Sequence, residues 1–518
     1  MKLREIFKGI DLIKVDGDMD REISAVCCDS RKTENDSVFV AVKGLKVNGH
    51  DFLSDAIKRG AKALVVENNI MGRGHGSGVR EKLAPCPPKQ VRGRLLPLAP
   101  DVTYITVPDS RKALALMSDR FYGRPSEDMS IIGITGTNGK TTTSYLISSI
   151  IEAEGFKTGI VGTIDYRFDG EIIPAPNTTP ESLDLHGLFR KMSDRKVKYC
   201  VMEVSSHSLE LDRVYGTRFE TGVFTNLTRD HLDFHNTMEM YFGAKARLFR
   251  EYGLKKAVIN IDDPYGRRLL NDVKADRVLS YGIEERADVM ARDISISRKG
   301  LKFICDAPSG KFEVESRLIG RHNVYNILAA IAAAILEGFS RESIEKGVLS
   351  LDAVSGRLEK IEEGQDFTVL VDYAHTDDAL KNVLNAARGL PHNKIFSVFG
   401  CGGDRDRGKR PLMGRIGAEY SDFAIITSDN PRSEDPNKIM EEIEKGILDN
   451  RQVSKPVNWT KIPDRRKAIE FAISRASGED IVIIAGKGHE DYQILGDRKI
   501  RFDDREVAKE AIRNRGRV

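Results

Sequence analysis

The sequence predicts an α/β fold that is divided into three domains and built on parallel sheets. The chain has 518 residues, a length that favours about two to four domains over a single core. Short apolar runs rich in β-branched residues alternate with longer amphipathic stretches, which is typical of parallel strands separated by helices. One such run leads through a glycine-containing turn into a helical pattern, which is typical of a nucleotide-binding domain.

The first 107 residues predict a small α/β domain. Strands are expected at 37–42 and 63–67, with a helix at 52–61 between them. The stretch 71–100 is rich in Gly, Pro and Arg and has no periodicity, so we expect a flexible surface insertion. Its basic side chains could meet a phosphate, but a solvated loop is the preferred interpretation. The first domain boundary is placed near 107.

The remaining chain predicts two further domains. The second contains a strand at 130–135, a helix at 141–155 and strands at 199–206, 221–228 and 255–261. A helical region ends within 351–360, where a new series of strands begins, so the second boundary is placed near 352. Strands follow at 367–374, 394–400, 423–429 and 481–486. The predicted domains are therefore 1–107, 108–352 and 353–518.

Composition excludes several classes of function. The formal net charge of +3 is too small for this length to indicate a nucleic-acid or membrane partner. The six cysteines form no Cys-x-x-Cys pair, so neither a zinc site nor a disulfide framework is expected. No apolar run is long enough for a signal peptide or a membrane span. We therefore expect a cytoplasmic enzyme.

The segment "IGITGTNGKTTT" at 132–143 predicts a phosphate-binding loop between a strand and a helix. Two glycines let the backbone approach a phosphate, the lysine can reach the β- and γ-phosphates, and a threonine hydroxyl can bind Mg²⁺. Ile134 stands where the usual pattern has glycine, so the loop is a variant. A plain connecting turn is the alternative, but it does not explain the order of strand, turn, Lys-Thr and helix. The predicted ATP-binding residues are Gly136, Thr137, Asn138, Gly139, Lys140, Thr141 and Thr142.

This loop resembles the ATP loop of the Mur ligase family, which also includes the folylpolyglutamate synthases. The resemblance covers essentially the whole chain. It implies an N-terminal uridine-nucleotide-binding α/β domain, a central P-loop ATPase domain with a parallel sheet, and a C-terminal Rossmann-like domain. It also implies that ATP hydrolysis drives amide-bond formation through an acyl phosphate.

The resemblance also implies a magnesium site. "MEVSSHSLELDR" places Glu203 at a strand end, "TRDHLDFH" contains His231, and a helical pattern carries Lys245. In isolation Lys245 would be interpreted as a solvated lysine and His231 as a capping or core-edge histidine. In the family the matching lysine is carbamylated by CO₂ and so becomes an anionic oxygen ligand. The implied metal ligands are Thr141, Glu203, His231 and carbamylated Lys245, and the implied catalytic residues are Lys140, Glu203, His231 and Lys245.

Two further motifs resemble the subgroup that adds the third residue of the peptidoglycan stem peptide. "CDSR" at 28–31 and "NTTPE" at 177–181 match contacts with UDP-MurNAc-L-Ala-D-Glu. The implied acceptor-binding residues are Ser30, Asn177, Thr178, Thr179, Ser205 and Arg213. Leu211 stands where some members have glutamine, so that contact is not transferred. In "DYAHTDDAL", Asp377 replaces the proline of the family, which leaves the rigidity of this loop open.

"TSDNPRSEDP" at 427–436 bears on the choice of amino acid. A guanidinium can bind the second carboxylate of meso-diaminopimelate in a bidentate manner, whereas lysine offers no such partner. "DNPR" resembles the diaminopimelate-adding signature, although Asn-Pro also favours a turn, and such a turn could present the arginine. The implied diaminopimelate-binding residues are Arg405, Asp429, Asn430, Pro431, Arg432, Gly486 and Glu490.

The preferred hypothesis is an ATP-dependent acid–amino-acid ligase of the 6.3.2 type. It would use Mg²⁺, and it would join meso-diaminopimelate to UDP-MurNAc-L-Ala-D-Glu. We expect a monomer with no nucleic-acid partner and no membrane insertion. The alternatives are an L-lysine-adding ligase, a folylpolyglutamate synthase, and a P-loop switch or motor ATPase. The last would leave the acceptor motifs without a role.

Overall fold

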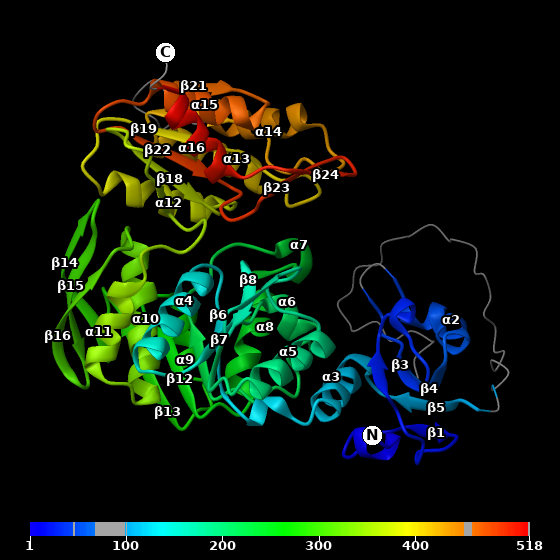
Figure 1. The fold of residues 1–518 in the computed structure, drawn as a ribbon. Coiled ribbons are helices and arrows are strands. Elements are labelled where there is room, and N and C mark those ends of the chain that lie inside the picture. Colours follow the sequence, from blue (N-terminus) through cyan, green and yellow to red (C-terminus); the bar gives the residue numbers. More distant parts are fainter. Residues whose placement is uncertain (45–46, 68–98, 100, 450–457, 516–518) are drawn as a thin grey trace. The chain divides into compact units, whose positions relative to one another are not determined.

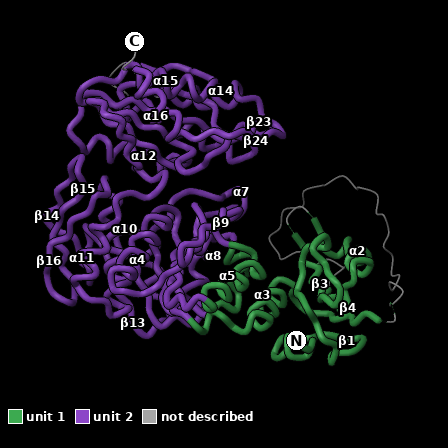
Figure 2. Tube along the Cα trace, viewed as in Figure 1, with its two compact units in different colours: residues 1–128, 180–194, 208–217 green, residues 129–179, 195–207, 218–518 purple. Residues whose placement is uncertain are grey.

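The computed structural model describes residues 1–44, 47–67, 99, 101–449 and 458–515. The predicted insertion at 71–100 lies outside the described residues, apart from Ala99. The chain separates into two compact units (Figure 2). The first unit comprises residues 1–128, 180–194 and 208–217, and the second comprises residues 129–179, 195–207 and 218–518. No helix in the described ranges is long and apolar enough to cross a membrane.

The first unit contains a sheet with the strand order β1-β5-β4-β3-β2. Its strands are β1 (Lys14–Asp16), β2 (Ala25–Cys27), β3 (Ser37–Val40), β4 (Ala61–Glu67) and β5 (Thr103–Val107). All neighbours are parallel except β1, which runs antiparallel to β5. The strands predicted at 37–42 and 63–67 correspond to β3 and β4. The helical elements are α1 (Leu3–Ile6), η1 (Ser30–Lys32), η2 (Gly49–Phe52), α2 (Leu53–Lys58), α3 (Ser110–Phe121), η3 (Pro125–Glu127) and α5 (Ser182–Asp194).

The second unit begins with a large mixed sheet of order β16-β15-β14-β13-β12-β11-β6-β10-β7-β8-β9. The strands are β6 (Ser130–Thr135), β7 (Thr158–Val161), β8 (Asp165–Phe168), β9 (Glu171–Pro174), β10 (Tyr199–Glu203), β11 (Thr221–Phe224), β12 (Lys256–Asn260), β13 (Arg277–Gly282), β14 (Val289–Ser297), β15 (Gly300–Ala307) and β16 (Gly310–Ser316). The run from β7 to β14 is parallel, which confirms the predicted parallel core. The antiparallel edges β8–β9 and β15–β16 were not predicted.

Helices cover this sheet and fill its core. They are α4 (Lys140–Ala153), α7 (Leu232–His235), α8 (Met238–Glu251), α9 (Pro264–Leu270), α10 (Arg321–Glu337) and α11 (Arg341–Ser350), whereas the short α6 (Ser206–Glu210) has residues in both units. Figure 1 shows α4, α10 and α11 grouped together on the sheet. Ile147 and Ile150 of α4 and Ala330 of α10 are buried in one core with Ile132 of β6. This packing fixes the start of α4 at the end of β6.

Three neighbouring parallel strands end at one edge of the sheet, and this edge carries the candidate site. In the register, Glu203 at the end of β10 pairs with Ile134 of β6, and Phe224 at the end of β11 pairs with Thr135. In open parallel sheets, ligands bind beyond the carboxyl ends of the strands.

The last part of the second unit contains a sheet of order β17-β18-β22-β19-β20-β21. The strands are β17 (Glu359–Ile361), β18 (Thr368–Asp372), β19 (Ile395–Phe399), β20 (Phe423–Ile426), β21 (Asn458–Lys461) and β22 (Ile481–Ala485), with a separate hairpin of β23 (Tyr492–Leu495) and β24 (Arg498–Arg501). The helices are α12 (Asp377–Arg388), α13 (Lys409–Tyr420), α14 (Pro436–Leu448), α15 (Arg465–Arg475) and α16 (Asp504–Arg515). Only β17 is antiparallel to its neighbour within this six-stranded sheet.

The fold class is thus the predicted one, with one α/β sheet in each third of the chain. The boundaries near 107 and 352 remain predictions. Helix α3, which follows the first of them, belongs to the first unit.

Candidate active site

The phosphate loop connects β6 to α4, as the sequence predicts. Gly136 has φ 150° and Gly139 has φ 87°, and a Cβ atom on these residues would lie 1.8 Å from Thr225 Oγ1 and 2.3 Å from Asn326 Oδ1 respectively. Other residues would therefore strain the backbone and clash. Asn226 holds the loop, because its carbonyl accepts from Thr137 N at 2.8 Å and its Oδ1 accepts from Asn138 N at 2.9 Å. The open amides at the start of α4 then form a site for an anion.

Two lysines meet at one carbonyl oxygen of this loop. Lys140 Nζ donates to Gly136 O at 3.0 Å and to Thr137 O at 2.9 Å. Lys245 Nζ, from α8, donates to the same Gly136 oxygen at 2.8 Å. Burial lowers the pKa of Lys140, and burial and the charge of Lys140 lower the pKa of Lys245 well below its usual value. Because Lys245 is only 1% exposed, its neutral amine is strongly favoured.

Glu203 and Thr141 form the second part of the site. The Thr141 hydroxyl donates to Glu203 Oε1 at 2.9 Å, and the carboxylate also accepts from the amide and the hydroxyl of Thr163 at 2.9 and 3.0 Å. Glu203 is 1% exposed. A buried carboxylate beside a hydroxyl at the end of the phosphate loop offers the oxygen ligands that Mg²⁺ prefers.

His231 is the N-cap residue directly before α7 and has a left-handed conformation with φ 53°. Its Nε2 lies 3.4 Å from Asp230 Oδ2, and its ring stands edge-on to Tyr241 at 6.0 Å between centroids. Partial burial and nearby cations, Lys245 and Lys140 among them, lower the pKa of His231, so the neutral imidazole is favoured. That is the form able to bind a metal.

The predicted metal ligands are thus only partly assembled around one point. Thr141 and Glu203 are in direct contact, whereas Lys245 and His231 approach the loop separately. Among the described side chains, no group of three or more His, Cys, Asp and Glu converges as a metal site. The oxygen pair of Thr141 and Glu203 nevertheless fits Mg²⁺, and the buried amine of Lys245 fits a group that gains an anionic oxygen after modification.

The predicted acceptor residues divide between the two units. Thr178 and Thr179 precede α5, and the Thr179 hydroxyl donates to Glu203 O at 2.8 Å and to Ser205 Oγ at 3.3 Å. Asn177 accepts at its carbonyl from the Tyr166 hydroxyl at 2.5 Å. These residues surround the end of β10, next to the phosphate loop. In the first unit, Arg213 pairs with Glu181 at 2.8 Å.

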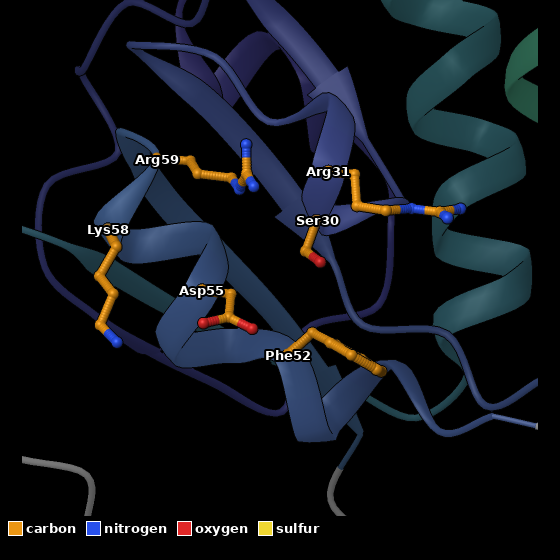
Figure 3. A pocket seen from close by; sticks show the side chains of 6 residues that line it. All are labelled: Ser30, Arg31, Phe52, Asp55, Lys58 and Arg59. Carbon is orange, nitrogen blue, oxygen red and sulfur yellow. The ribbon is translucent and has the colours of Figure 1, made fainter.

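Ser30 lines a pocket of about 440 Å³ in the first unit (Figure 3). The pocket lies between η1 and α2, and its lining is Ser30, Arg31, Phe52, Asp55, Lys58 and Arg59. Three of these side chains are cationic, although Arg31 is paired with Asp29 at 2.7 Å. An aromatic ring together with basic side chains offers stacking and charge to a nucleotide.

The "DNPR" segment lies after β20 and is anchored by a buried polar network. Lys487 Nζ is fully buried and donates to Asn430 Oδ1 at 3.1 Å and to Glu490 Oε2 at 3.2 Å. Asn430 Nδ2 also donates to Glu490 Oε2 at 3.0 Å. Burial raises the pKa of Asp429, but the cations Lys487 and Arg465 hold it below its usual value. The network brings together residues that the sequence assigned to one amino-acid site.

Gly486 lies against Asp429 in this network. A Cβ atom on Gly486, where φ is 122°, would stand 2.6 Å from Asp429 Oδ2. This carboxylate oxygen is buried and accepts no hydrogen bond from the described residues. It is therefore positioned to accept from an amino group of a ligand.

Arg432 follows Pro431 in a left-handed conformation with φ 52°. Its Nη1 donates to Gly403 O at 2.8 Å and contacts Asn430 O at 3.5 Å. Within the described residues it forms no ion pair with a carboxylate, so the guanidinium keeps donors for an anion. Arg405 is exposed on the adjacent loop, with its Cγ 3.8 Å from a Cβ built on Gly402, which itself lies 2.9 Å from Arg432 Nη1. Both predicted arginines thus flank Gly402.

Sequence reasoning missed three polar partners of the phosphate loop. Arg357 Nη2 donates to Thr141 Oγ1 at 3.1 Å, and Thr163 holds the carboxylate of Glu203. Asp378 Oδ2 accepts from Asn138 Nδ2 at 2.8 Å and from Thr228 Oγ1 at 3.1 Å. Asp378 stands in "DYAHTDDAL" and Arg357 in the segment 351–360 where the second boundary was placed, but the contacts of both residues with the phosphate loop were not predicted.

The loop in which Asp377 replaces proline is well defined. Asp377 is the first residue of α12, and the side chain of Thr376 caps the helix by accepting from Ala379 N. Proline is favoured at this first position, and so is a carboxylate, because it faces the positive end of the helix dipole. The replacement therefore retains a good helix start.

The chain is similar to known proteins over nearly its whole length. Three family models match the chain, namely "Mur ligase family, catalytic domain" at residues 22–122, "Mur ligase middle domain" at 134–334 and "Mur ligase, glutamate ligase domain" at 356–488. A Clostridium tetani protein described as UDP-N-acetylmuramoyl-L-alanyl-D-glutamate--2,6-diaminopimelate ligase is 43% identical over 514 residues, which is 99% of each chain.

Two further proteins carry the same description. One from Solibacter usitatus is 47% identical over 500 residues, covering 96% of this chain and 94% of its own. A solved structure is similar with a TM-score of 0.68 and 33% identity, covering 100% of this chain and 99% of its own. The likeness therefore extends over all three sheets.

Proposed function

Because the chain belongs to the Mur ligase family, we propose that it is an ATP-dependent ligase that joins meso-2,6-diaminopimelate to UDP-MurNAc-L-Ala-D-Glu. The products are the UDP-MurNAc-tripeptide, ADP and phosphate, and the reaction is a step of peptidoglycan synthesis. Relatives described as this ligase are 43% and 47% identical over nearly the whole chain. Of the residues themselves, Arg432 supports the choice of amino acid most directly.

The chemistry of Arg432 explains this choice. Its guanidinium is held by the carbonyl oxygens of Gly403 and Asn430 and is not neutralised by a carboxylate of the described chain. The second carboxylate of diaminopimelate would accept two parallel hydrogen bonds from such a group. L-Lysine has an ammonium at the same end, which the guanidinium would repel. Discrimination of this kind can reach about 10⁴-fold.

Phosphoryl transfer would take place at the phosphate loop. The amides at the start of α4 hold the phosphates of ATP, and Lys140 turns from Gly136 and Thr137 to the β- and γ-phosphates. A carboxylate oxygen of the D-Glu residue attacks the γ-phosphorus, the bond to the β–γ bridging oxygen breaks, and ADP leaves. Arg357, which contacts Thr141, adds positive charge beside the transferred group.

Thr141, Glu203, His231 and carbamylated Lys245 would hold magnesium. Bound Mg²⁺ supplies charge neutralisation between the γ-phosphate and the incoming carboxylate. The neutral amine of Lys245 is the form that bonds to CO₂, with loss of one proton to give the carbamate. Burial of Lys245 favours that neutral form.

Amide formation completes the reaction. The acyl phosphate receives the attack of a diaminopimelate amine on its acyl carbon, the amine loses a proton, and the bond from carbon to the phosphate oxygen breaks. Asp429 Oδ2, which accepts no hydrogen bond from the described residues, would accept from an ammonium group of diaminopimelate. The remaining contacts to the acceptor are assigned to Ser30, Asn177, Thr178, Thr179, Ser205 and Arg213, with the first domain at 1–107 carrying the uridine nucleotide.

A product assay tests this function. The protein is incubated with Mg²⁺-ATP, UDP-MurNAc-L-Ala-D-Glu, and either meso-diaminopimelate or L-lysine, and the products are identified by mass. Tripeptide formation with meso-diaminopimelate, at a kcat/KM far above that for L-lysine, is the expected result. The reverse preference would indicate a lysine-adding enzyme. ATP hydrolysis that ignores both additions would indicate a switch ATPase instead.

A further inference from the structure

Two loops that carry the arginines of the amino-acid site are fastened to each other by two carboxylates. The first is the 402–408 loop, which follows β19, and the second is the 430–434 loop, which follows β20. Asp404 in the first loop accepts from the hydroxyl of Ser433 at 2.6 Å and from its amide at 3.3 Å. Glu434 in the second loop accepts from the amide of Asp404 at 2.6 Å. Each loop therefore supplies a carboxylate that the other loop's donors bind.

A fully buried arginine anchors this pair of loops. Arg410, at the start of α13, donates to Glu434 Oε1 at 2.7 Å and to Glu434 Oε2 at 2.9 Å. Its Nη1 also donates to Glu442 of α14 at 2.9 Å. The hydrogen bonds from Arg410 lower the pKa of Glu434 to about 2, so this carboxylate is charged at neutral pH.

The backbone of both loops is shaped to place the two arginines. Asp404 and Arg432 both have left-handed conformations, with φ 54° and 52°. Gly403 N donates to Asn430 O at 2.9 Å, and Gly403 O accepts from Arg432 Nη1 at 2.8 Å. A non-glycine residue in this conformation persists only where the surroundings hold it. The β23–β24 hairpin holds the backbone of Arg432 directly, since the Arg432 amide donates to Ile494 O at 3.2 Å and its carbonyl accepts from Gly496 N at 2.9 Å, while Asp404 holds the next residue, Ser433.

We propose that Glu434, together with Asp404, is a positioning residue that determines amino-acid selectivity. The two carboxylates hold the loops so that the side chains of Arg432 and Arg405 keep a fixed position relative to each other. The proposal rests on the proposed function, since it takes the diaminopimelate carboxylate as the ligand of Arg432. Neither carboxylate is assigned a contact with the substrate. Both act through the arginines, whose bidentate contact needs placement within about 0.5 Å.

Glu442 provides a matched control. It is bonded to the same Arg410 and is exposed to a similar extent, 19% against 24% for Glu434, but it lies in α14 and contacts neither Asp404 nor Ser433. Glu442 also accepts from Arg407 of the first loop, so removing Glu442 weakens the anchors of Arg410 and Arg407 but leaves the hydrogen bonds among Asp404, Ser433 and Glu434 in place. A merely structural role for the ion pairs predicts that both substitutions have the same effect on kinetics.

The experiment compares Glu434→Ala, Glu434→Gln and Glu442→Ala with the wild type. KM and kcat are measured for meso-diaminopimelate, L-lysine and ATP, and the melting temperature is measured for each variant. For Glu434→Ala we expect KM for meso-diaminopimelate to rise about tenfold or more, kcat at saturation to change less than about threefold, and KM for ATP to remain within about twofold. The ratio of kcat/KM between meso-diaminopimelate and L-lysine should fall in parallel.

The remaining variants complete the test. Glu434→Gln should recover part of the loss, because its amide oxygen can still accept from Asp404 N. Glu442→Ala should leave both KM values and the selectivity ratio within about twofold of the wild type. Equal effects of Glu434→Ala and Glu442→Ala, or an equal rise in KM for ATP and for meso-diaminopimelate, would overturn the proposal.

Two further readouts separate the possible failures. If Glu434→Ala does not fold, Ser433→Ala removes only the hydroxyl donor to Asp404, and it should lower the selectivity ratio by about threefold or more. An unchanged ratio in that variant would refute the proposal. If instead the wild type does not convert meso-diaminopimelate at all, the proposed function itself is wrong.

Discussion

The side-chain nitrogens of Lys140 and Lys245 both donate to the carbonyl oxygen of Gly136, but the two lysines are assigned different roles. Lys140 belongs to the loop and can turn toward a phosphate, whereas Lys245 reaches the loop from α8 and is 1% exposed. Two cations this close repel each other, and burial adds to the cost of keeping both charged. We expect the enzyme to remove this conflict by converting Lys245 into a carbamate.

A substitution at Lys245 tests that role. Lys245→Ala should lower kcat by at least about 10³-fold, since it removes an oxygen ligand of the metal. Formate or acetate, added in the millimolar range, should restore part of the activity by occupying the space of the carbamate. Lys256→Ala, which removes a lysine from β12 on the same sheet, should show no dependence on these anions. Equal stimulation of both variants would contradict the carbamate assignment.

Arg432 gives a second prediction at this scale. Arg432→Ala should raise KM for meso-diaminopimelate about 100-fold, because a bidentate charged contact is lost, and should leave KM for ATP within about twofold. Arg498→Ala on the exposed strand β24 serves as the control and should change neither value. Steady-state kinetics with each substrate varied in turn measures both effects. A similar rise in the two KM values would rule out the assigned contact.

Single residues were predictable where a local motif dictates them. The glycines of the phosphate loop follow from the backbone it needs, and the Asn-Pro turn correctly indicated a bend before Arg432. The partners of those residues were not predictable. Arg357 meets Thr141 across 216 residues of chain, and no local pattern encodes that contact.

Among the helices, α12 gives a test of the residue that departs from the family. Thr376 has φ −116° and ψ 161°, a conformation well suited to precede proline, and Asp377 occupies the first helical position. Asp377→Pro should therefore change the free energy of unfolding by less than about 1 kcal/mol. Ala379→Pro removes the amide that Thr376 caps and should cost at least about 1 kcal/mol. Urea denaturation compares the two, and an equal loss in both variants would contradict the assigned helix start.

Helices α3 and α5 give a prediction about pH. His186 of α5 is fully buried, and its Nδ1 lies 3.5 Å from Asp119 Oδ1 of α3. Burial lowers the pKa of His186 to about 3 and raises the pKa of Asp119 to about 6. Between its folded pKa and its usual value, His186 makes stability fall as the pH falls, because the unfolded chain binds the proton more readily. Asp119 acts in the opposite sense, because there the folded state binds the proton more readily.

Asp119→Asn tests the contribution of Asp119, because it removes the carboxylate and leaves His186 in place. Above pH 7 the variant should be more stable than the wild type by about 2 kcal/mol, since a charged carboxylate is no longer buried. The difference should shrink as the pH falls toward 4, because the folded wild type takes up a proton on Asp119 below about pH 6. Urea denaturation at about pH 7.5 and about pH 4.5 measures the difference on either side of this pKa. A variant less stable than the wild type at the higher pH would instead show that Asp119 forms a charged pair with His186.

The sequence predicted most elements that are buried on both faces and fewer of those at the edges. Strand β6 was placed correctly at 130–135 because its apolar run is bounded by a polar residue and a glycine. Strands β15 and β16 alternate buried and exposed residues, and such alternation is a weaker signal in a chain dominated by continuous apolar runs. The predicted strand at 199–206 ended too late because Val204 is as buried as the strand itself, although β10 ends at Glu203.

At the scale of the whole molecule, Asp378 links the last third of the chain to the phosphate loop. It accepts from Asn138 across 240 residues and from Thr228 across 150. Asp378→Ala should raise KM for ATP by about 10- to 100-fold, since the loop loses charged hydrogen bonds that order it. Asp377→Ala, at the adjacent position, should change KM for ATP less than about threefold. Titration of both variants with ATP measures these changes. An equal rise in KM for ATP would show that only the negative charge at the start of α12 matters, and not the hydrogen bonds of Asp378.

The sequence predicted the division of the whole chain into sheets and compact units only in part. The α/β class and the presence of three sheets followed from the periodicity and length, and the comparisons confirm the family. The composition of the first compact unit was not foreseen, because residues 180–194 and 208–217 belong to it although they follow the phosphate loop. Leu183 of α5 packs on the same core as Leu114 of α3, and such a return of the chain leaves no local signature.

The inclusion of residues 180–194 and 208–217 in the first unit has a consequence for synthesis of the chain. The first unit cannot be completed when its own sheet emerges from the ribosome, because α5 and the segment that ends at residue 217 are still to be translated. Translation proceeds at roughly 5–20 residues per second, so part of the apolar surface of the sheet stays uncovered for seconds after the sheet has emerged. A nascent chain of this protein therefore spends part of its synthesis as a natural client for chaperones, and a truncated chain ending at residue 128 would retain that exposed surface permanently.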